Sequence, residues 1–213
     1  MSDNKRRALV DTDFVNHIIS SSTNGKDILQ KIFEEFNIIP VVHPWVAANE
    51  FVTTGLQNLL KTGIIKVLSQ SEIVGSDDEF LKQYEAVASQ MYLRLNDESI
   101  SFDGKIFEIR KAQSSLGEIH TVITAKYLSI PIMCSDDHGA KDIAPLVNND
   151  SFKLCVYNAF DVINEISQNS ETKITYKECD RILSKCNEFN TKRYKELTKT
   201  IKENYRTHEH IKR

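Results

Sequence analysis

Acidic residues stand at a few positions of this sequence where their carboxylates could gather around a metal ion. Asp11 follows the apolar run Ala8-Leu9-Val10, and Asp136 with Asp137 follows a second apolar run, residues 130–134. Both runs are expected to be β-strands. Ligands of parallel sheets bind beyond the carboxyl ends of the strands, so these acids are expected to share one edge. Crowded carboxylates repel one another, and divalent cations relieve the repulsion; a set of oxygen ligands favours Mg²⁺ or Mn²⁺ over zinc.

Strands and helices alternate along the chain and would position these acids. Apolar residues at helical spacing predict helices over residues 14–20, 27–36, 44–60, 76–95, 118–128, 141–147 and 161–166. Short apolar runs predict strands over residues 8–10, 38–42, 64–68, 130–134 and 152–157. Residues 96–113 stay open between a hairpin around Asp103-Gly104 and a loop that leads into a helix. The alternation predicts an α/β fold, a three-layer α/β/α arrangement with a central, mostly parallel sheet.

The composition is that of one globular domain with an appendage. The chain has 213 residues, 40% of them hydrophobic, and a net charge of -3. It contains no run of roughly 20 apolar residues, and its start lacks the apolar segment of a signal peptide, so we expect a cytoplasmic protein with no membrane partner. The four cysteines form no Cys-x-x-Cys pair and are expected to be reduced thiols.

The last part of the sequence is basic. Residues 169–213 hold 12 Lys and Arg against 7 Asp and Glu, whereas the chain as a whole is acidic. Apolar residues at helical spacing predict that this segment is entirely helical. We therefore predict a domain over residues 1–168 and a basic helical extension over residues 169–213. Its positive charge could meet phosphates or balance the acidic domain, and its apolar stripes need a covering surface, either the domain or a partner.

Each acid could also have a purely structural role. Thr12 or Asp13 could cap the first helix, which would leave Asp11 without such a role. The spacing of Ser115 and Glu118 fits a capping box. One of the acids Asp136 and Asp137 could cap the helix that follows them, and Glu50, expected in the middle of a helix, could simply be solvated.

Three segments together resemble one protein family. Residues 116–137, LGEIHTVITAKYLSIPIMCSDD, resemble the latter half of a PIN domain, in which an acid opens a helix, a short hydrophobic strand follows, and Ser or Thr precedes an Asp. Residues 9–13, LVDTD, resemble the opening strand of that family, with Asp13 where Asn or Ser is usual. Residues 46–51, VAANEF, resemble the helix that carries a second acid. The resemblance covers roughly residues 7–168, but residues 69–113 are longer than in a minimal member and the extension has no counterpart.

The resemblance implies a metal-dependent ribonuclease that hydrolyses RNA phosphodiester bonds with a metal-activated water. Carried over by position, it implies Mg²⁺ or Mn²⁺ as the cofactor, with Asp13 and Ser135 in supporting roles. The implied catalytic and metal-binding residues are Asp11, Glu50, Glu118 and Asp137, with Asp136 as an additional metal ligand. Many such proteins are toxins of toxin-antitoxin systems, so the expected partners are RNA and an antitoxin, another protein or a second copy of the chain in a homodimer.

Several alternatives stay open beside this hypothesis. His138 and Lys141 could contact phosphate or simply begin a solvated helix. The chain could instead be a catalytically silent PIN-like binding module that acts through its helical tail. A phosphorelay receiver domain also has acids at strand ends, but the lysine expected on a late strand end is missing. A zinc site has weaker support, because its residues are loosely spaced and the cysteines fit an apolar stripe; those residues are Cys179, Cys186, His208 and His210.

Overall fold

The computed structural model describes residues 5–75, 78–110, 115–186 and 191–211. Its strands are β1 (Arg6–Val10), β2 (Ile38–Val42), β3 (Lys66–Val67), β4 (Ile132–Cys134) and β5 (Cys155–Tyr157). Its helices are α1 (Thr12–Ile19), α2 (Gly25–Glu35), α3 (Pro44–Asn49), α4 (Thr54–Lys61), α5 (Gln70–Val74), α6 (Asp78–Asn96), α7 (Leu116–Tyr127), α8 (His138–Ile143), the 3₁₀ helix η1 (Ala144–Val147), α9 (Ala159–Gln168), α10 (Tyr176–Leu183) and α11 (Lys192–Ile211).

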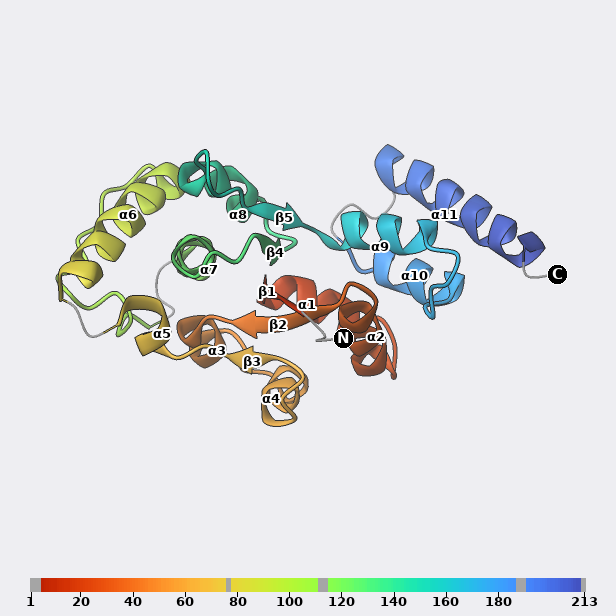
Figure 1. The fold of residues 1–213 in the computed structure, drawn as a ribbon, viewed down its shortest axis with the longest axis horizontal. Helices are drawn as coiled ribbons and strands as arrows, with labels where there is room; N and C mark the ends of the chain where they lie inside the picture. Colours follow the sequence, from red (N-terminus) through yellow and green to blue (C-terminus); the bar gives the residue numbers. More distant parts are fainter. Residues whose placement is uncertain (1–4, 76–77, 111–114, 187–190, 212–213) are drawn as a thin grey trace.

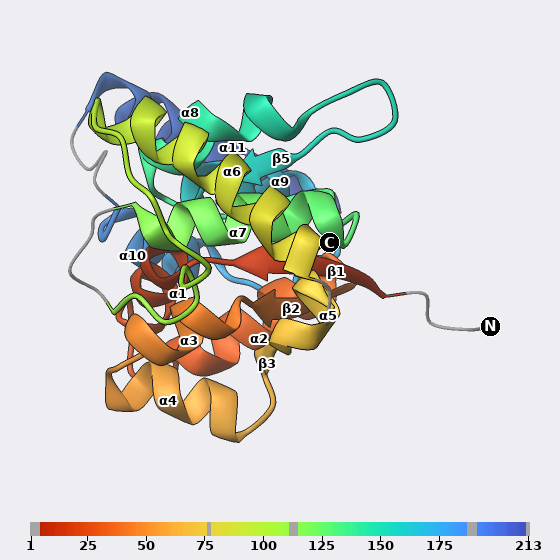
Figure 2. The same ribbon diagram turned by 90° about the vertical axis from the view of Figure 1, so that its left-hand side faces the viewer.

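The five strands form one parallel sheet in the order β3-β2-β1-β4-β5. Figures 1 and 2 show helices on both faces, with α1, α2 and α9 on one side and α7, backed by α6 and α8, on the other. The predicted three-layer α/β/α class is therefore confirmed. The chain leaves the neighbouring strands β1 and β4 toward opposite edges of the sheet. In folds with such a switch of direction, ligands bind beyond the carboxyl ends of the strands at that point.

The register of the central strands brings their carboxyl ends level. Leu9 of β1 pairs with Met133 of β4 and with Val41 of β2. Beyond the paired residues, the Asp11 amide donates to the Cys134 carbonyl at 2.9 Å. The apolar residues that precede Asp11 are fully buried, so the strand is fixed between the two helical layers.

Residues 44–60, predicted as one helix, form two. α3 ends at Glu50, whose backbone departs from helical geometry (φ −121°, ψ −32°), and α4 begins after Thr53. The Thr53 hydroxyl accepts from the Leu56 amide at 3.4 Å, and this cap starts a new helix where the apolar spacing alone indicates continuity. The prediction that Glu50 lies mid-helix is therefore wrong.

One further segment differs from the predictions, and another, left open between a hairpin and a loop, is a loop where the structure describes it. Residues 70–74 form α5, which the apolar spacing does not predict, although Ser69 and Glu72 make the capping box that the sequence pattern signals. Residues 97–110 form a loop with a turn at Asp103 and Gly104, both at positive φ, and contain no strand. The predicted helix start at residues 76 and 77 lies outside the described residues.

The C-terminal extension contains α10 and α11, but residues 169–175 form a loop with turns, so the prediction that the segment is entirely helical is wrong there. α10 packs against α9, and α11 packs against α9 and α10 at the end of the molecule opposite α6 (Figure 1). Ile201 of α11 and Cys179, Ile182 and Leu183 of α10 are buried. The domain itself thus covers the apolar stripes of the extension at these positions.

Candidate metal centre at the carboxyl end of the sheet

Asp11 lies at the carboxyl end of β1 and is 5% exposed. One carboxylate oxygen accepts from the Thr12 amide at 2.7 Å, and the other accepts from the Ser135 hydroxyl at 2.8 Å. Asp11 is itself the N-cap of α1, so the prediction that Thr12 or Asp13 caps this helix is wrong. Uncharged groups thus donate both of these hydrogen bonds to Asp11. Because Asp11 is buried, ionisation of its carboxylate costs free energy.

Ser135 links the ends of β1 and β4. Its side chain is fully buried, and its hydroxyl donates to Asp11 while accepting from the Asp137 amide at 3.2 Å. The Ser135 hydroxyl therefore orients both Asp11 and the turn that carries Asp137. These hydrogen bonds place Ser135 beside the acids, and its supporting role stays a prediction.

Asp137 and Glu118 reach the same edge from two helices. Asp137 caps α8 by accepting from the Gly139 amide at 2.7 Å, which confirms the capping role predicted for one of the adjacent acids. Glu118 lies in the first turn of α7, and its carboxyl interacts with those of Asp137 and Asp11. The capping box predicted for Glu118 is wrong, because Ser115 is in the left-handed region and its side chain makes no capping hydrogen bond.

Glu50 completes the group from the end of α3. One oxygen of its carboxylate accepts from the Thr12 hydroxyl at 2.9 Å. The carboxylate also lies against Gly117 at the start of α7, so closely that a Cβ atom there would overlap it. Gly117 thus has a specific role, because only a residue without a side chain lets Glu50 approach the neighbour of Glu118. We call Asp11, Glu50, Glu118 and Asp137 the carboxylate group.

Burial and mutual repulsion make ionisation of this group unfavourable. Desolvation, then repulsion by Glu50, raises the pKa of Asp11 to about 7. Desolvation, then repulsion by Asp11, raises the pKa of Glu118 to about 8. Among the residues that the structure describes, no Lys or Arg forms an ion pair with Asp11, Glu118 or Asp137. The donor set is entirely oxygen, as Mg²⁺ and Mn²⁺ prefer, and a divalent cation would offset the repulsion.

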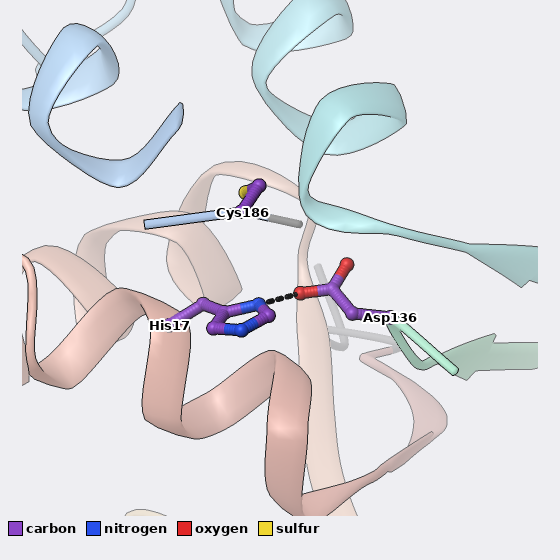
Figure 3. A group of neighbouring side chains, drawn as sticks. All are labelled: His17, Asp136 and Cys186. Atoms are coloured by element: carbon purple, nitrogen blue, oxygen red, sulfur yellow. Dashed lines mark hydrogen bonds and ion pairs between the residues drawn. The ribbon is translucent and has the colours of Figure 1, made fainter. Parts of the chain in front are cut away.

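Asp136 is directed to other partners than the carboxylate group. One of its oxygens accepts from the Ala159 amide at 2.7 Å, and the other contacts Nδ1 of His17 on α1. Figure 3 shows this contact, with Cys186 facing the pair from the segment after α10. The hydrogen bond to Asp136 raises the pKa of His17. We therefore do not retain the prediction of Asp136 as an additional ligand of the carboxylate group.

Sequence reasoning missed His17 and the involvement of Cys186. His17 belongs to a helix whose apolar stripe is evident from the sequence, but His17 itself is a polar residue on the flank of that stripe. The apolar spacing of the extension predicts Cys186 as a core cysteine, and it is indeed buried. Their meeting at Asp136 joins residues far apart in the sequence, and no local spacing signals it.

The remaining predicted residues lie around the carboxylate group. Asp13 is exposed in the first turn of α1 and adds to the repulsion on Asp11. His138 is exposed at the start of α8, and Lys141 forms an ion pair with Asp161 of α9 at 3.3 Å. Arg193 of α11 pairs with the same Asp161 at 3.4 Å, so two cations converge there.

Cys179 is separate from Cys186 in its contacts, because its thiol meets the Tyr205 hydroxyl at 3.4 Å. His208 lies against the Tyr205 ring, and the side chain of His210 is outside the described part of the chain. The loosely spaced zinc alternative thus gains no support from the described side chains.

Comparison of the chain with known proteins gave no match to a family model, a curated protein or a solved structure. Over the described residues, no helix has the length and apolar character needed to cross a membrane.

Proposed function

We propose that this chain is a metal-dependent nuclease that hydrolyses phosphodiester bonds of RNA, with a site of the PIN type. The observation that carries the proposal is the placement of Asp11, Glu50, Glu118 and Asp137 at one edge of a parallel sheet, where Asp11 interacts with Glu50 and Glu118 interacts with Asp11 and Asp137, and where the pKa values of Asp11 and Glu118 are raised. A buried set of acids is a costly arrangement, and its cost is offset when a divalent cation binds.

The carboxylate group would hold one or two Mg²⁺ or Mn²⁺ ions. When bound, such an ion supplies an activated water and neutralises charge on the phosphodiester. Ser135 holds the Asp11 carboxylate in place and fixes the turn of Asp137. Thr12 and Gly117 set the position of Glu50. No side-chain nucleophile is required for this chemistry.

RNA as the substrate rests on the family resemblance of residues 9–13, 46–51 and 116–137. The same resemblance motivates the proposal of a toxin whose activity an antitoxin blocks. We include Lys141 and Arg193, which both form ion pairs with Asp161, as cations that would contact the phosphates of a bound strand.

The test is a cleavage assay on single-stranded RNA with the purified chain and Mn²⁺. We expect cleavage by the wild type and a loss of more than about 100-fold for Asp11→Asn, because the variant removes the charge of a central ligand. The matched control is Asp142→Asn, which removes one carboxylate from an exposed position on α8 and should cleave like the wild type.

Equal cleavage by Asp11→Asn and Asp142→Asn, both shown to be folded by circular dichroism, would overturn the mechanism. An alternative is a catalytically silent binding module that acts through α10 and α11. That alternative predicts no RNA cleavage, no Mn²⁺ affinity by calorimetry, and a partner complex that survives Glu50→Gln.

A further inference from the structure

A second group of metal-ligand side chains lies beside the carboxylate group and differs from it in chemistry. A ring nitrogen of His17, a carboxylate oxygen of Asp136 and Sγ of Cys186 all lie within 4.8 Å of one another. The proposed nuclease mechanism uses none of them. The three residues come from α1, from the turn after β4 and from the segment after α10, and Figure 3 shows Cys186 beside the contact of His17 with Asp136.

We propose that His17, Asp136 and Cys186 form a binding site for Zn²⁺ or a similar borderline-soft divalent ion, and that this ion fastens the C-terminal extension to the α/β domain. The proposal does not depend on nuclease activity. A nitrogen, an oxygen and a sulfur ligand form a set that suits Zn²⁺ and excludes Mg²⁺, which avoids thiolates. Three protein ligands leave the fourth tetrahedral position to a water molecule.

The surroundings fix two of the ligands in the required direction. The Ala159 amide donates to the second oxygen of Asp136 at 2.7 Å, which turns the first oxygen toward His17 and Cys186. Outer hydrogen bonds of this kind orient ligands and strengthen metal binding. His17 is carried by a helix that Phe14 and Ile18 anchor in the core.

The three ligands are also shielded from water. The side chain of His17 is 18% exposed, that of Asp136 is 8% exposed, and Cys186 is buried. A small hollow of about 20 Å³, lined by Asp136, Lys141 and Cys186 among others but not by His17, adjoins the group and has room for one water molecule. Binding would require His17 and Asp136 to move slightly apart, because an ion then replaces their direct contact.

The location gives the site a structural role. His17 and Asp136 belong to the α/β domain, whereas Cys186 belongs to the extension that begins after α9. An ion held by all three would join the extension to the turn that leads to Asp137. We therefore expect it to stabilise the packing of α10 against α9 without supplying chemistry at the carboxylate group.

The test is a Co²⁺ titration of the reduced, full-length chain in excess Mg²⁺, which occupies the oxygen ligands of the carboxylate group. A thiolate bound to Co²⁺ produces a near-ultraviolet charge-transfer band, and tetrahedral coordination gives visible bands. We expect both at one equivalent of Co²⁺, and their loss when Zn²⁺ displaces the cobalt. Cys186→Ser should abolish the charge-transfer band and weaken Co²⁺ binding by at least about 100-fold.

Matched variants separate this site from the remaining thiols and acids of the chain. Cys155→Ser removes a half-buried thiol from β5 and should keep the band, and Asp11→Asn should keep it too because that acid belongs to the other group. His17→Gln should weaken Co²⁺ binding at least about 10-fold while Cys186 remains, which provides a second variant if Cys186→Ser does not fold. No charge-transfer band in the wild type, or a band that persists in Cys186→Ser, would overturn the proposal. Loss of RNA cleavage in Asp11→Asn with an intact cobalt spectrum would show that the two sites are independent.

Discussion

Two buried polar regions of this molecule experience the same physical effect with opposite consequences. In the carboxylate group, desolvation raises the pKa of Asp11 to about 7. In the aromatic cluster of His43, His120, Tyr84, Phe107 and Trp45, desolvation lowers the pKa of His120 to about 3. Burial disfavours the charged form in both regions.

The two regions differ in the charge state that their side chains would ordinarily have at neutral pH. The histidines are neutral there, and packing holds them in place: His43 stacks on His120 with ring centroids 4.3 Å apart, and Tyr84 hydrogen-bonds to His120 at 2.8 Å. The acids would ordinarily be ionised there, and their neighbours are other acids. A buried group whose ordinary charge state is penalised is a mark of function, whereas the aromatic cluster is accounted for by its packing.

The strongest effect should be on the pH dependence of stability in the absence of divalent cations. The folded chain keeps the Asp11 proton up to about pH 7, whereas the unfolded chain releases it near the ordinary value of 3.8. The folded state binds more protons across this interval, so the free energy of unfolding should fall as the pH rises through it. Asp11→Asn should remove the part of this fall that Asp11 contributes, roughly a few kcal/mol at pH 8, while the part due to Glu118, whose pKa is also raised, should remain.

Urea unfolding at several pH values, with a chelator present, measures this effect. Adding Mn²⁺ should restore stability to the wild type but much less to Asp11→Asn. A wild type that is equally stable from pH 5 to pH 8, with and without Mn²⁺, would show that burial does not penalise the charged form of the carboxylate group.

The aromatic cluster predicts the opposite pH dependence. The unfolded chain protonates His120 near the ordinary value of 6.5 and the folded chain only near pH 3, so the free energy of unfolding should fall as the pH decreases across this range. His120→Gln should cost about 2 kcal/mol at neutral pH through lost packing and should flatten this acid limb. Thermal unfolding of the wild type and of His120→Gln from pH 4 to pH 7 measures this loss of stability. An equally steep loss in the variant would contradict the lowered pKa of His120 as its cause. Mn²⁺ should not change the difference in the free energy of unfolding between the wild type and His120→Gln, because His120 is not part of the carboxylate group.

The weakest effect on stability should be that of Gly117→Ala. Alanine favours a helix over glycine by up to about 1 kcal/mol, so the fold should be retained or slightly stabilised. The added Cβ displaces the flexible end of Glu50, and Mn²⁺ affinity should drop about 10-fold because one ligand shifts. Calorimetry with Mn²⁺ and a melting curve separate the two effects, and Gly55→Ala in α4, where the added Cβ would meet only a methyl group of Ile19, serves as the control. An unchanged Mn²⁺ affinity in Gly117→Ala would show that Glu50 is not part of the site.

Sequence patterns were informative where local spacing determines structure. Apolar runs located the strands of the sheet, and chain direction placed Asp11 and Asp137 at one edge. Apolar spacing did not predict the helix boundary at Thr53. The hydroxyl of this residue caps α4 and divides residues 44–60 into two helices. The same hydroxyl chemistry made a capping box at Ser115 plausible, but the left-handed backbone at that residue prevents it.

Contacts between distant segments could not be predicted from spacing. The partnership of Thr12 with Glu50 depends on how α3 ends against α1, and the contact of Asp136 with His17 depends on how α1 and β4 pack together. Adjacent acids in the sequence thus serve different groups in the structure. The side chain of Asp137 turns toward Glu118, while that of Asp136 turns toward His17.

Whether the carboxylate group is a metal centre can be decided by a crystal structure of the chain soaked in Mn²⁺, with anomalous diffraction used to locate the ion. We expect an anomalous peak bound by Asp11, Glu118 and Asp137, with Glu50 alongside, and loss of that peak in Asp11→Asn. The absence of any peak at these residues at millimolar Mn²⁺ would contradict the assignment of the carboxylate group as a metal centre.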